Sequence, residues 1–543
     1  MNKLAFLLLG ILLTSSPGQK SELDDIRLVI FFSVDQMSPH LLNQYEPLYT
    51  GGFRWLIDHS RQFTNTHYEH GYTATGPGHF VLASGQHPGP NGILGNYWYD
   101  RELKHTVSCV EDTVSKVVGY EGDARSYRQI NANTLGDWLK NRYPDSKVYS
   151  VAGKDRSAAM MGGKHADLAL YYNWRGSFVT SSYYIDTLPE WLIKYNKKLN
   201  AVSYRDSLWT RSLPFEVYDR YAHEDFFEGE SDRYHSEPYS PVFPIGFDAD
   251  ASDKDVVNGF FGFPWMDRAT IDLAKVIVQE EGLGQDRNPD ILFVGLSATD
   301  AIVHDYGPNS HEAMDAMLKI DRYLKNLIST VEDAVGLENV LFVLTSDHGG
   351  LALPEYRQKM GLPGGRISRP ERKTAIQDVF ILLEKHYGSS DFVVNDGLGF
   401  YYDLGRMREM DIKKTDVDTI IRESVEKVTG IARVLTKDEI FSSHSGDTVL
   451  ARLKNSFHPV KSPDLWILQE KYWVTKYPRG TGHGTPYDYD THVPLLFSKA
   501  GQKQTTVSRK IMMVDIAPTI AAMLGINIPK GIDGVPITEM QKQ

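Results

Sequence analysis

Cysteine is almost absent from this chain of 543 residues, in which Cys109 is the single example. A lone thiol cannot form an intramolecular disulfide bond, so the fold has to rely on its packed core. The same scarcity excludes a zinc site built from several cysteines. Any metal ion would therefore be held by histidine and carboxylate side chains.

The chain also lacks an excess of positive charge. It contains 58 Lys and Arg against 70 Asp and Glu, which gives a formal net charge of −12 and a pI of about 5.8. A surface that neutralises a nucleic-acid backbone needs many basic residues, so we expect no nucleic-acid partner. A small phosphate ester needs only a local positive site, and the composition does not exclude it.

Long apolar segments are missing as well. The run Leu4–Leu13 follows a short basic start and is too short to span a bilayer. Small residues come next, a pattern typical of a secretory signal peptide, and we expect residues 1–18 to be removed by cleavage after Gly18. The alternative is a buried N-terminal helix. No later run is long enough to cross a membrane, so the sequence predicts a periplasmic or secreted protein without a membrane span.

Several apolar runs lead to acidic or histidine side chains. Leu28 to Val34 is followed by Asp35, and Val340 to Leu344 leads to Asp347 and His348. Such runs are typical of strands buried on both faces of a parallel sheet. Open α/β sheets bind ligands at the carboxyl ends of their strands, so we expect these side chains to gather at one edge. For Asp347 and His348 the alternative is a surface turn, in which Asp and Gly are common, and for Asp35 it is a helix-capping aspartate.

Further candidates follow a third run, Asp290–Leu296. Asp300 and His304 are four residues apart, which places a carboxylate and an imidazole on one face of a helical turn. His483 lies in a glycine loop. The alternative for each is a solvated surface residue. The candidate metal ligands are Asp35, Asp300, His304, Asp347, His348 and His483, with Thr75 as a seventh.

Thr75 lies in a glycine-rich turn that leads into an apolar, helix-like segment. A hydroxyl at a helix N-terminus meets backbone N–H groups, and a nucleophilic alkoxide would be stabilised there. An N-cap threonine is the alternative. Farther along, Asn96 lies in a tight glycine turn.

Lys154 and Arg156 follow another expected strand, Lys147–Ala152. In extended chain, positions two apart share a face, so both cations can reach the same point. Two cations at a strand end suit a phosphoryl group. A solvated basic turn is the alternative.

Two long segments interrupt this pattern. Residues 171–265 are rich in Tyr, Trp, Pro and acids and lack regular apolar strands, so we interpret them as an insertion that covers the site. Residues 366–475 are interpreted as a second insertion with a small α+β fold. Between the strands we expect helices from Ser38 to about Tyr49, closed by Gly51 and Gly52, and from His311 to about Val331.

The motifs in order are VDQM at Val34–Met37, TxxGH at Thr75–His79, GNxWYD at Gly95–Asp100, KDR at Lys154–Arg156, TDxxxHxxGPNS at Thr299–Ser310, SDHG at Ser346–Gly349 and THVPLLF at Thr491–Phe497. In this order the sequence resembles the alkaline phosphatase superfamily, and most closely the bacterial phosphate-irrepressible enzymes of the PafA type. The match covers nearly the whole chain after residue 18. Each motif alone is weak, but their succession is highly specific.

The resemblance implies an α/β fold with a central, mostly parallel sheet flanked by helices, in which residues 19–543 form a catalytic domain and the two insertions form a cap. It implies two zinc ions per chain. One zinc is assigned to Asp300, His304 and His483, and the other to Asp35, Asp347, His348 and the Thr75 oxygen. Thr75 would be the nucleophile, and the residues that would hold the phosphoryl oxygens are Asn96, Lys154 and Arg156.

The expected activity is therefore that of a zinc-dependent alkaline phosphatase, which hydrolyses small phosphate monoesters through a phospho-threonine intermediate. A phosphodiesterase or nucleotide pyrophosphatase of the same superfamily is the alternative enzyme. An inactive zinc- or phosphate-binding protein is the alternative from another class. A sulfatase is not expected, because the Cys/Ser-x-Pro-x-Arg motif of that family does not occur at Cys109. The natural substrate and the oligomeric state stay open.

Overall fold

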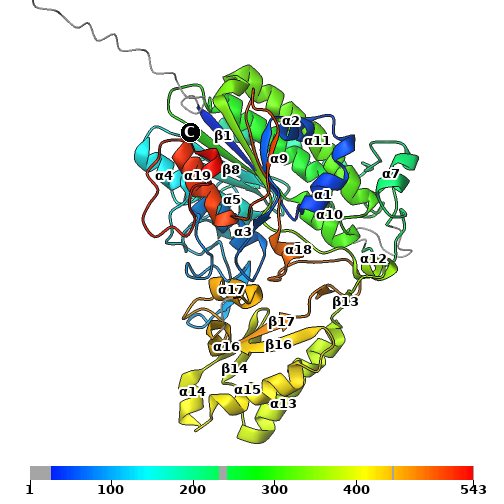
Figure 1. Ribbon diagram of the computed structural model, residues 1–543, viewed down its shortest axis with the longest axis vertical. Helices are drawn as coiled ribbons and strands as arrows, with labels where there is room; N and C mark the ends of the chain where they lie inside the picture. The colour runs from blue at the N-terminus through cyan, green and yellow to red at the C-terminus, as the bar shows by residue number, and fades with distance from the viewer. Residues whose placement is uncertain (1–25, 232–240, 443–445, 542–543) are drawn as a thin grey trace, which may run out of the picture.

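The computed structural model describes residues 26–231, 241–442 and 446–541. A nine-stranded sheet forms its centre (Figure 1). In spatial order the strands are β10 (Phe178–Val179), β9 (Leu168–Tyr172), β8 (Val148–Ala152), β11 (Asp290–Leu296), β1 (Leu28–Val34), β12 (Val340–Thr345), β19 (Leu495–Ser498), β2 (Ser60–Phe63) and β20 (Thr505–Val507).

The five strands from β9 to β12 run parallel, whereas β10 and β19 pair antiparallel with their neighbours. The expected mostly parallel sheet is confirmed. The strands expected at Leu28–Val34 and Asp290–Leu296 have those bounds. Both are apolar at nearly every position because helices cover both faces of the sheet.

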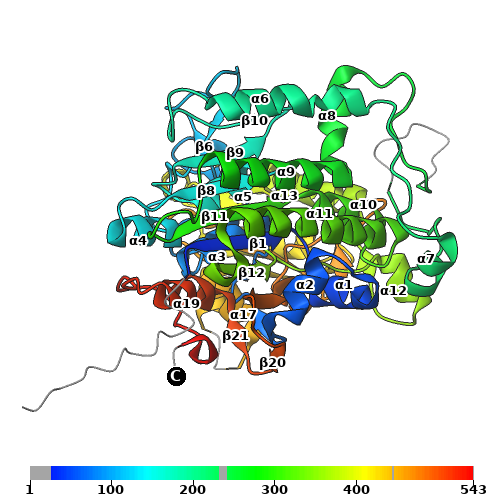
Figure 2. The same cartoon turned by 90° about the horizontal axis from the view of Figure 1, so that it is seen from above.

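Helices form a layer on each face of the sheet. Leu28, Ile30 and Phe32 of β1 pack into the core beneath α1 (Pro39–Gln44), α2 (Gly52–Asp58), α9 (Pro264–Glu280) and α11 (His311–Val335). Val29 and Phe31 face the opposite core, which includes residues of α3 (Thr75–Ser84), α4 (Leu135–Arg142) and α19 (Ile516–Met523). Figure 2 shows α9 and α11 on one side of the sheet and α19 on the other.

The helix expected from Ser38 to Tyr49 is shorter than predicted. α1 ends at Gln44, and a 3-10 turn at Glu46–Leu48 follows. Gly52 begins α2 instead of closing a helix, so that part of the prediction is wrong. The cause is distant in sequence: the buried carboxylate of Asp321 accepts hydrogen bonds from the Gly51 and Phe53 N–H groups, 2.7 and 2.8 Å away, and so satisfies the free donors of α2.

The segment 171–265 was expected to lack strands, and its first residues contradict this. Tyr171 and Tyr172 complete β9, and β10 pairs with them across a tight turn to form the edge of the sheet. The short, aromatic β10 carries too little alternation to be recognised in the sequence. The helices α6 (Glu190–Leu199), α7 (Phe215–Tyr221) and α8 (Asp253–Gly259) follow.

Residues 366–475 form a separate small lobe at the bottom of Figure 1. Its four-stranded antiparallel sheet consists, in spatial order, of β14 (Val393–Asp396), β15 (Gly399–Tyr402), β17 (Leu465–Gln469) and β16 (Ile431–Thr436). The helices α13 (Arg369–Tyr387) and α15 (Lys414–Val425) pack on this sheet around their own apolar core. The lobe therefore has the expected α+β composition.

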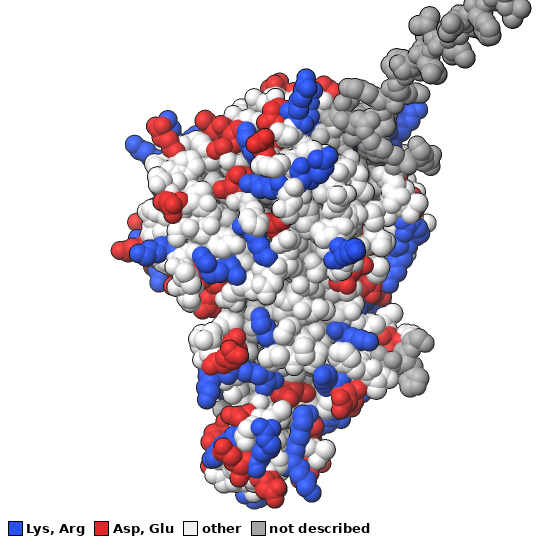
Figure 3. Space-filling view, turned by 90° about the vertical axis from the view of Figure 1, so that its left-hand side faces the viewer, with Lys and Arg blue, Asp and Glu red and all other residues white. Residues whose placement is uncertain are grey.

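Charged side chains of both signs are interspersed on the face shown in Figure 3. Within residues 26–231, 241–442 and 446–541, no helix combines the length and the apolar character that crossing a bilayer requires. The predicted signal peptide lies outside the described residues.

Candidate active site

The site lies at the edge where the parallel strands end. The register aligns Val34 of β1 with Leu296 of β11, and Ser33 with Thr345 of β12. Because these strands end side by side, the residues that follow them leave the sheet at the same place. The structure thereby brings Asp35, Asp300 and Asp347 together, with all three side chains buried.

Asp300, His304 and His483 form the first group of candidate metal ligands. Each offers a ligand atom, and these atoms all lie within 4.8 Å of one another. Asp300 and His304 lie on α10 (Ala298–Tyr306), one turn apart, with Asp300 Oδ1 3.5 Å from His304 Nε2. His483 comes from the glycine loop and places its Nε2 3.4 Å from the same oxygen. This is the set that the sequence analysis assigned to one zinc.

A second group lies beside the first and consists of Asp35, His79 and Asp347. His79 Nε2 lies 3.4 Å from Asp35 Oδ1. His348 also borders this group, with its Nε2 3.2 Å from Asp347 Oδ2 and 4.0 Å from Asp300 Oδ1. His348 was predicted to be a ligand here, whereas His79 was not singled out.

Four histidines in the two groups share one hydrogen-bond arrangement. In each, Nδ1 lies within hydrogen-bond distance of a backbone carbonyl oxygen, which can only accept, so Nδ1 carries the proton. The pairs are His79 with Thr75 (2.9 Å), His304 with Thr481 (2.7 Å), His348 with Gly349 (2.9 Å) and His483 with Thr73 (2.7 Å). In a neutral ring, Nε2 then presents a lone pair toward the carboxylates, as metal-binding histidines do.

The carboxylates buried at this edge of the sheet need positive charge nearby to stabilise their negative charge. Asp35 Oδ1, Asp347 Oδ2 and His348 Nε2 are buried without a hydrogen-bond partner among the described residues. Burial and the neighbouring Asp347 raise the pKa of Asp35. The donor set therefore fits divalent metal ions bound by nitrogen and oxygen.

Thr75 is the first residue of α3 and is 1% exposed. The N-cap position belongs to Ala74, so the Thr75 hydroxyl does not serve as the helix cap. Lys154 Nζ donates to Thr75 Oγ1 over 3.3 Å. Asn96 lies close by, where its Oδ1 accepts from the Gly76 N–H at 2.7 Å. Of the three residues expected to hold a phosphoryl group, Lys154 thus contacts Thr75 and Asn96 contacts the next residue, Gly76.

Lys154 lies between the two groups of ligands. Its Nζ is 2.9 Å from Asp35 Oδ2 and 2.8 Å from Asp300 Oδ2. Burial would lower the pKa of Lys154, but these two carboxylates outweigh it and raise the pKa. The side chain is therefore a permanent positive charge beside Thr75.

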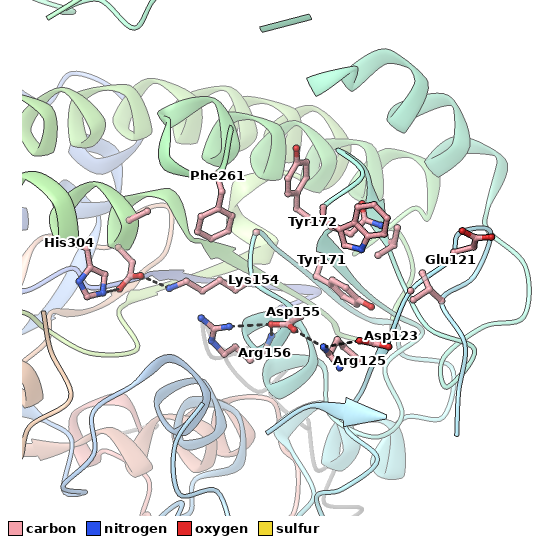
Figure 4. Close-up of a pocket in the computed structure, with 18 residues that line it drawn as sticks. Glu121, Asp123, Arg125, Lys154, Asp155, Arg156, Tyr171, Tyr172, Phe261 and His304 are labelled. Atoms are coloured by element: carbon pink, nitrogen blue, oxygen red, sulfur yellow. Dashed lines mark hydrogen bonds and ion pairs between the residues drawn. The ribbon is translucent and has the colours of Figure 1, made fainter. Parts of the chain in front are cut away.

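Arg156 reaches the site in a different way from the one predicted. The chain is not extended beyond Lys154, because α5 (Asp155–Gly162) begins there and Arg156 lies in its first turn. The prediction that Lys154 and Arg156 lie on one face of extended chain is therefore wrong. Both side chains nevertheless line one cavity of about 430 Å³, together with Asp300 and His304 (Figure 4).

The small lobe also borders the site. A second cavity of about 290 Å³ is lined by His483 and Tyr72 and, from the small lobe, by Arg372 and Trp466. The candidate ligand His483 therefore lies at a cavity that the small lobe helps to enclose.

Two residues of the site were missed by the sequence analysis. His79 is the last residue of the TxxGH motif, four positions after Thr75, and this helical spacing was the available signal. Gln36 follows Asp35 with a φ of 61°, which is uncommon for glutamine, and its N–H donates to Asp347 Oδ1 at 3.1 Å. This turn joins the ends of β1 and β12.

Comparison with known proteins identifies the family to which the chain belongs. Residues 29–493 match the family model of type I phosphodiesterases and nucleotide pyrophosphatases. The chain belongs to this family. Its members include phosphodiesterases and nucleotide pyrophosphatases, which were the alternative enzymes considered from the sequence. The matched residues include both groups of candidate ligands.

Among the proteins of similar sequence, PafA and PhoV are named alkaline phosphatases. PafA of Elizabethkingia meningoseptica is 29% identical over 98% of this chain and 98% of its own. PhoV of Synechococcus elongatus is 30% identical over 95% of this chain and 93% of its own. The resemblance found in the motifs is confirmed.

Solved structures of other proteins have the same fold as this chain. The crystal structure of wild-type PafA superimposes with a TM-score of 0.87 at 29% identity and covers 95% of this chain and 98% of its own. Murine ectonucleotide pyrophosphatase/phosphodiesterase 5 shares the fold with a TM-score of 0.50 at 13% identity. The α/β fold predicted from the sequence is confirmed.

Proposed function

We propose that this protein is a metal-dependent alkaline phosphatase that hydrolyses small phosphate monoesters. Its similarity to PafA and PhoV over nearly the whole chain supports the activity. The single observation that favours monoesters is the pair of cations, Lys154 and Arg156, which line one cavity, with Lys154 in contact with Thr75.

The metal in this proposal is zinc, with two ions per chain. Asp300, His304 and His483 would hold one ion. The second would be held by Asp35, Asp347 and His348 with the Thr75 oxygen, and His79 is available beside them. When bound, zinc would lower the pKa of a coordinated hydroxyl and stabilise negative charge on oxygen.

Thr75 is the nucleophile in the proposed reaction. Its Oγ attacks phosphorus, the bond from phosphorus to the leaving alcohol breaks, and a phospho-threonine remains. Water then attacks this ester, which restores the hydroxyl and releases phosphate. Asn96, which contacts Gly76, and Lys154, which contacts Thr75, orient the phosphoryl oxygens, and Arg156 adds a second positive charge. Positioning and charge stabilisation account for most of the catalysis of phosphoryl transfer.

The two cations favour a monoester over a diester for an electrostatic reason. A monoester is a dianion with three free oxygens, whereas in a diester a second substituent covers one oxygen and one charge is lost. Lys154 and Arg156 therefore stabilise the monoester more strongly. The second substituent would also compete with their side chains for space in the cavity.

The test replaces both Lys154 and Arg156 by Ala. Phenyl phosphate and methyl phenyl phosphate release the same phenol, so their comparison isolates the second substituent. We expect kcat/KM for the monoester to fall at least about tenfold more than for the diester, since charge-assisted contacts to a phosphoryl group exceed about 1.4 kcal/mol. Lys194→Ala, an exposed lysine on α6, is the control. If kcat/KM falls equally for the monoester and the diester, the protein would instead be assigned as a phosphodiesterase.

We also propose that the chain is exported after cleavage of residues 1–18. The support is the short apolar run Leu4–Leu13 with small residues after it. N-terminal sequencing of the protein from periplasm or medium should begin at Gln19, and an intact Met1 would contradict the proposal.

A further inference from the structure

The second cavity, which His483 shares with the small lobe, carries positive charge without negative charge. Its volume is about 290 Å³, and the described residues that line it include Arg372 and His483 but no aspartate or glutamate. Arg372 lies in the first turn of α13, so the small lobe supplies this charge to the wall of the cavity (Figure 1). A cavity with this charge distribution attracts anions.

The guanidinium group of Arg372 has no partner in the parts of the chain that the structure describes. Two other arginines of the small lobe are paired, Arg366 with Glu355 over 2.5 Å and Arg406 with Asp391 over 3.4 Å. Burial lowers the pKa of Arg372, because no carboxylate compensates for the water that it loses. The group still carries its charge at neutral pH, since a guanidinium is effectively always protonated in proteins. A half-buried cation with free donors is a candidate contact for a ligand.

Tyr72 adds a second donor to the same cavity. Its ring is held close to two glycines, because a Cβ on Gly95 would lie 2.9 Å from the ring and a Cβ on Gly484 would lie 3.5 Å from it. Its hydroxyl has no hydrogen-bond partner among residues 26–231, 241–442 and 446–541. Burial raises the pKa of Tyr72, although Arg372 acts in the opposite direction, so the hydroxyl keeps its proton. Both side chains can therefore donate to an anionic group in the cavity.

The first group of candidate metal ligands borders both cavities. Asp300 and His304 line the larger cavity with Lys154, whereas His483 lines the second. On the proposed function, Thr75 attacks phosphorus in line with the bond that breaks, so the leaving alcohol lies on the far side of phosphorus from Thr75. The cavity at His483 is therefore a space that the rest of the leaving group can enter.

The larger cavity suits an acidic leaving group less well. Figure 4 shows Glu121, Asp123 and Asp155 in the part of this cavity that lies away from His304. Arg125 is paired there with Asp155 over 3.2 Å. An anionic group would meet three carboxylates in that direction, whereas the described wall of the second cavity contains none.

We propose that Arg372 and Tyr72 form a leaving-group subsite for phosphate monoesters of small hydroxy acids. Arg372 would bind the carboxylate through two parallel hydrogen bonds, and the Tyr72 hydroxyl would donate a third. A carboxylate fits this space better than a second phosphate, because it is the smaller group and about 290 Å³ is at the lower end for small-molecule sites. This inference deepens the proposed function and rests on it.

The test compares 3-phosphoglycerate with glycerol 3-phosphate. Both esters carry phosphate on a primary alcohol of a three-carbon chain, and they differ in whether the far end is a carboxylate or a hydroxymethyl group. The intrinsic reactivity of each ester is the same for every variant, so a change in the ratio of their kcat/KM values reports the contact with the carboxylate. Arg372→Gln should lower this ratio by at least about tenfold, because charge-assisted hydrogen bonds contribute more than the roughly 1.4 kcal/mol that a factor of ten requires.

Further variants make the result specific. Tyr72→Phe removes only the hydroxyl and should lower the ratio by a smaller factor of about three. Arg369→Gln is the matched control, because it removes the same charge from an exposed position in the same turn of α13, and it should leave the ratio unchanged. Arg372→Met keeps the apolar stem of the side chain and replaces Arg372→Gln if that variant lowers the Tm.

The outcomes separate this inference from the proposed function. An unchanged ratio in Arg372→Gln overturns the subsite while monoester hydrolysis stands. An equal fall in Arg369→Gln would indicate a long-range effect of charge, and a fall in Arg125→Gln instead would place the carboxylate in the larger cavity; either result also overturns the subsite. If wild type hydrolyses neither these esters nor phenyl phosphate, the proposed function fails. Calorimetric binding of both esters to wild type and Arg372→Gln then decides the subsite by the ratio of their Kd values.

Discussion

Replacement of Gly78 by alanine should displace the nucleophile, Thr75, from the candidate metal ligands. Gly78 lies in α3, three residues after Thr75, where the helix meets the chain that follows β12. A Cβ at this position would lie 2.1 Å from the backbone oxygen of Asp347 and 2.8 Å from its carbonyl carbon. Because these are backbone atoms, no side-chain rotation can relieve the overlap. The helix or the Asp347 segment has to move.

The size of this movement sets the expected effect. An ordinary contact needs about 3.4 Å, so the two segments must separate by about 1 Å or more. Overpacking of this kind costs about 1–3 kcal/mol of stability. A displacement of about 1 Å between reacting groups can cost about 100-fold in rate. We therefore expect Gly78→Ala to lower the Tm by a few degrees and the monoester kcat/KM by about two orders of magnitude.

Melting curves and steady-state kinetics on the purified variant test this reasoning. Gly397→Ala is the matched control, because a Cβ there would meet nothing within 4 Å. The control should behave as wild type in both assays. Wild-type activity and Tm in Gly78→Ala would refute the argument that close contact between α3 and Asp347 positions Thr75.

Three further predictions concern the nucleophile, the metal and pH. Thr75→Ala should lower monoester turnover by several orders of magnitude at unchanged Tm, whereas Thr75→Ser should stay active because the hydroxyl survives; near-normal turnover in the alanine variant would remove Thr75 from the mechanism. His304→Ala and Asp347→Ala should each lose bound metal and nearly all activity, and elemental analysis that finds wild-type zinc in both would contradict their assignment as ligands. Burial raises the pKa of Asp267 to about 7, so its contribution to stability is complete below its unfolded pKa of about 4 and is lost as the pH rises through 7. Asp267→Asn should therefore gain stability relative to wild type as the pH rises from about 4 to about 7, as measured by urea unfolding. A difference in the free energy of unfolding that is independent of pH would argue against this shift.

The central sheet could be predicted from the sequence because its physical signal is local. β1 and β11 are apolar over their whole length since helices cover both faces, and each ends where Asp35 and Ser297 begin the site. An apolar run that stops at a polar residue therefore predicts both the strand and the end of the strand at which a ligand binds. The convergence of Asp35, Asp300 and Asp347 then followed from the general placement of ligands in such sheets.

Other features depend on contacts that no local pattern contains. Gly52 begins a helix because Asp321, far along the chain, accepts hydrogen bonds from its first turn. Arg156 lies in α5, whose start at Asp155 a strand pattern could not reveal. His79 escaped attention because only the fold shows its Nε2 facing Asp35.

The ratio of monoesterase to diesterase activity in the wild-type protein tests the central claim most directly. Phenyl phosphate and methyl phenyl phosphate should be compared with the zinc-loaded enzyme under one set of conditions. If Lys154 and Arg156 serve a dianion, kcat/KM for phenyl phosphate should be the larger by at least about tenfold. Equal values, or faster hydrolysis of the diester, would contradict the assignment as a phosphate monoesterase.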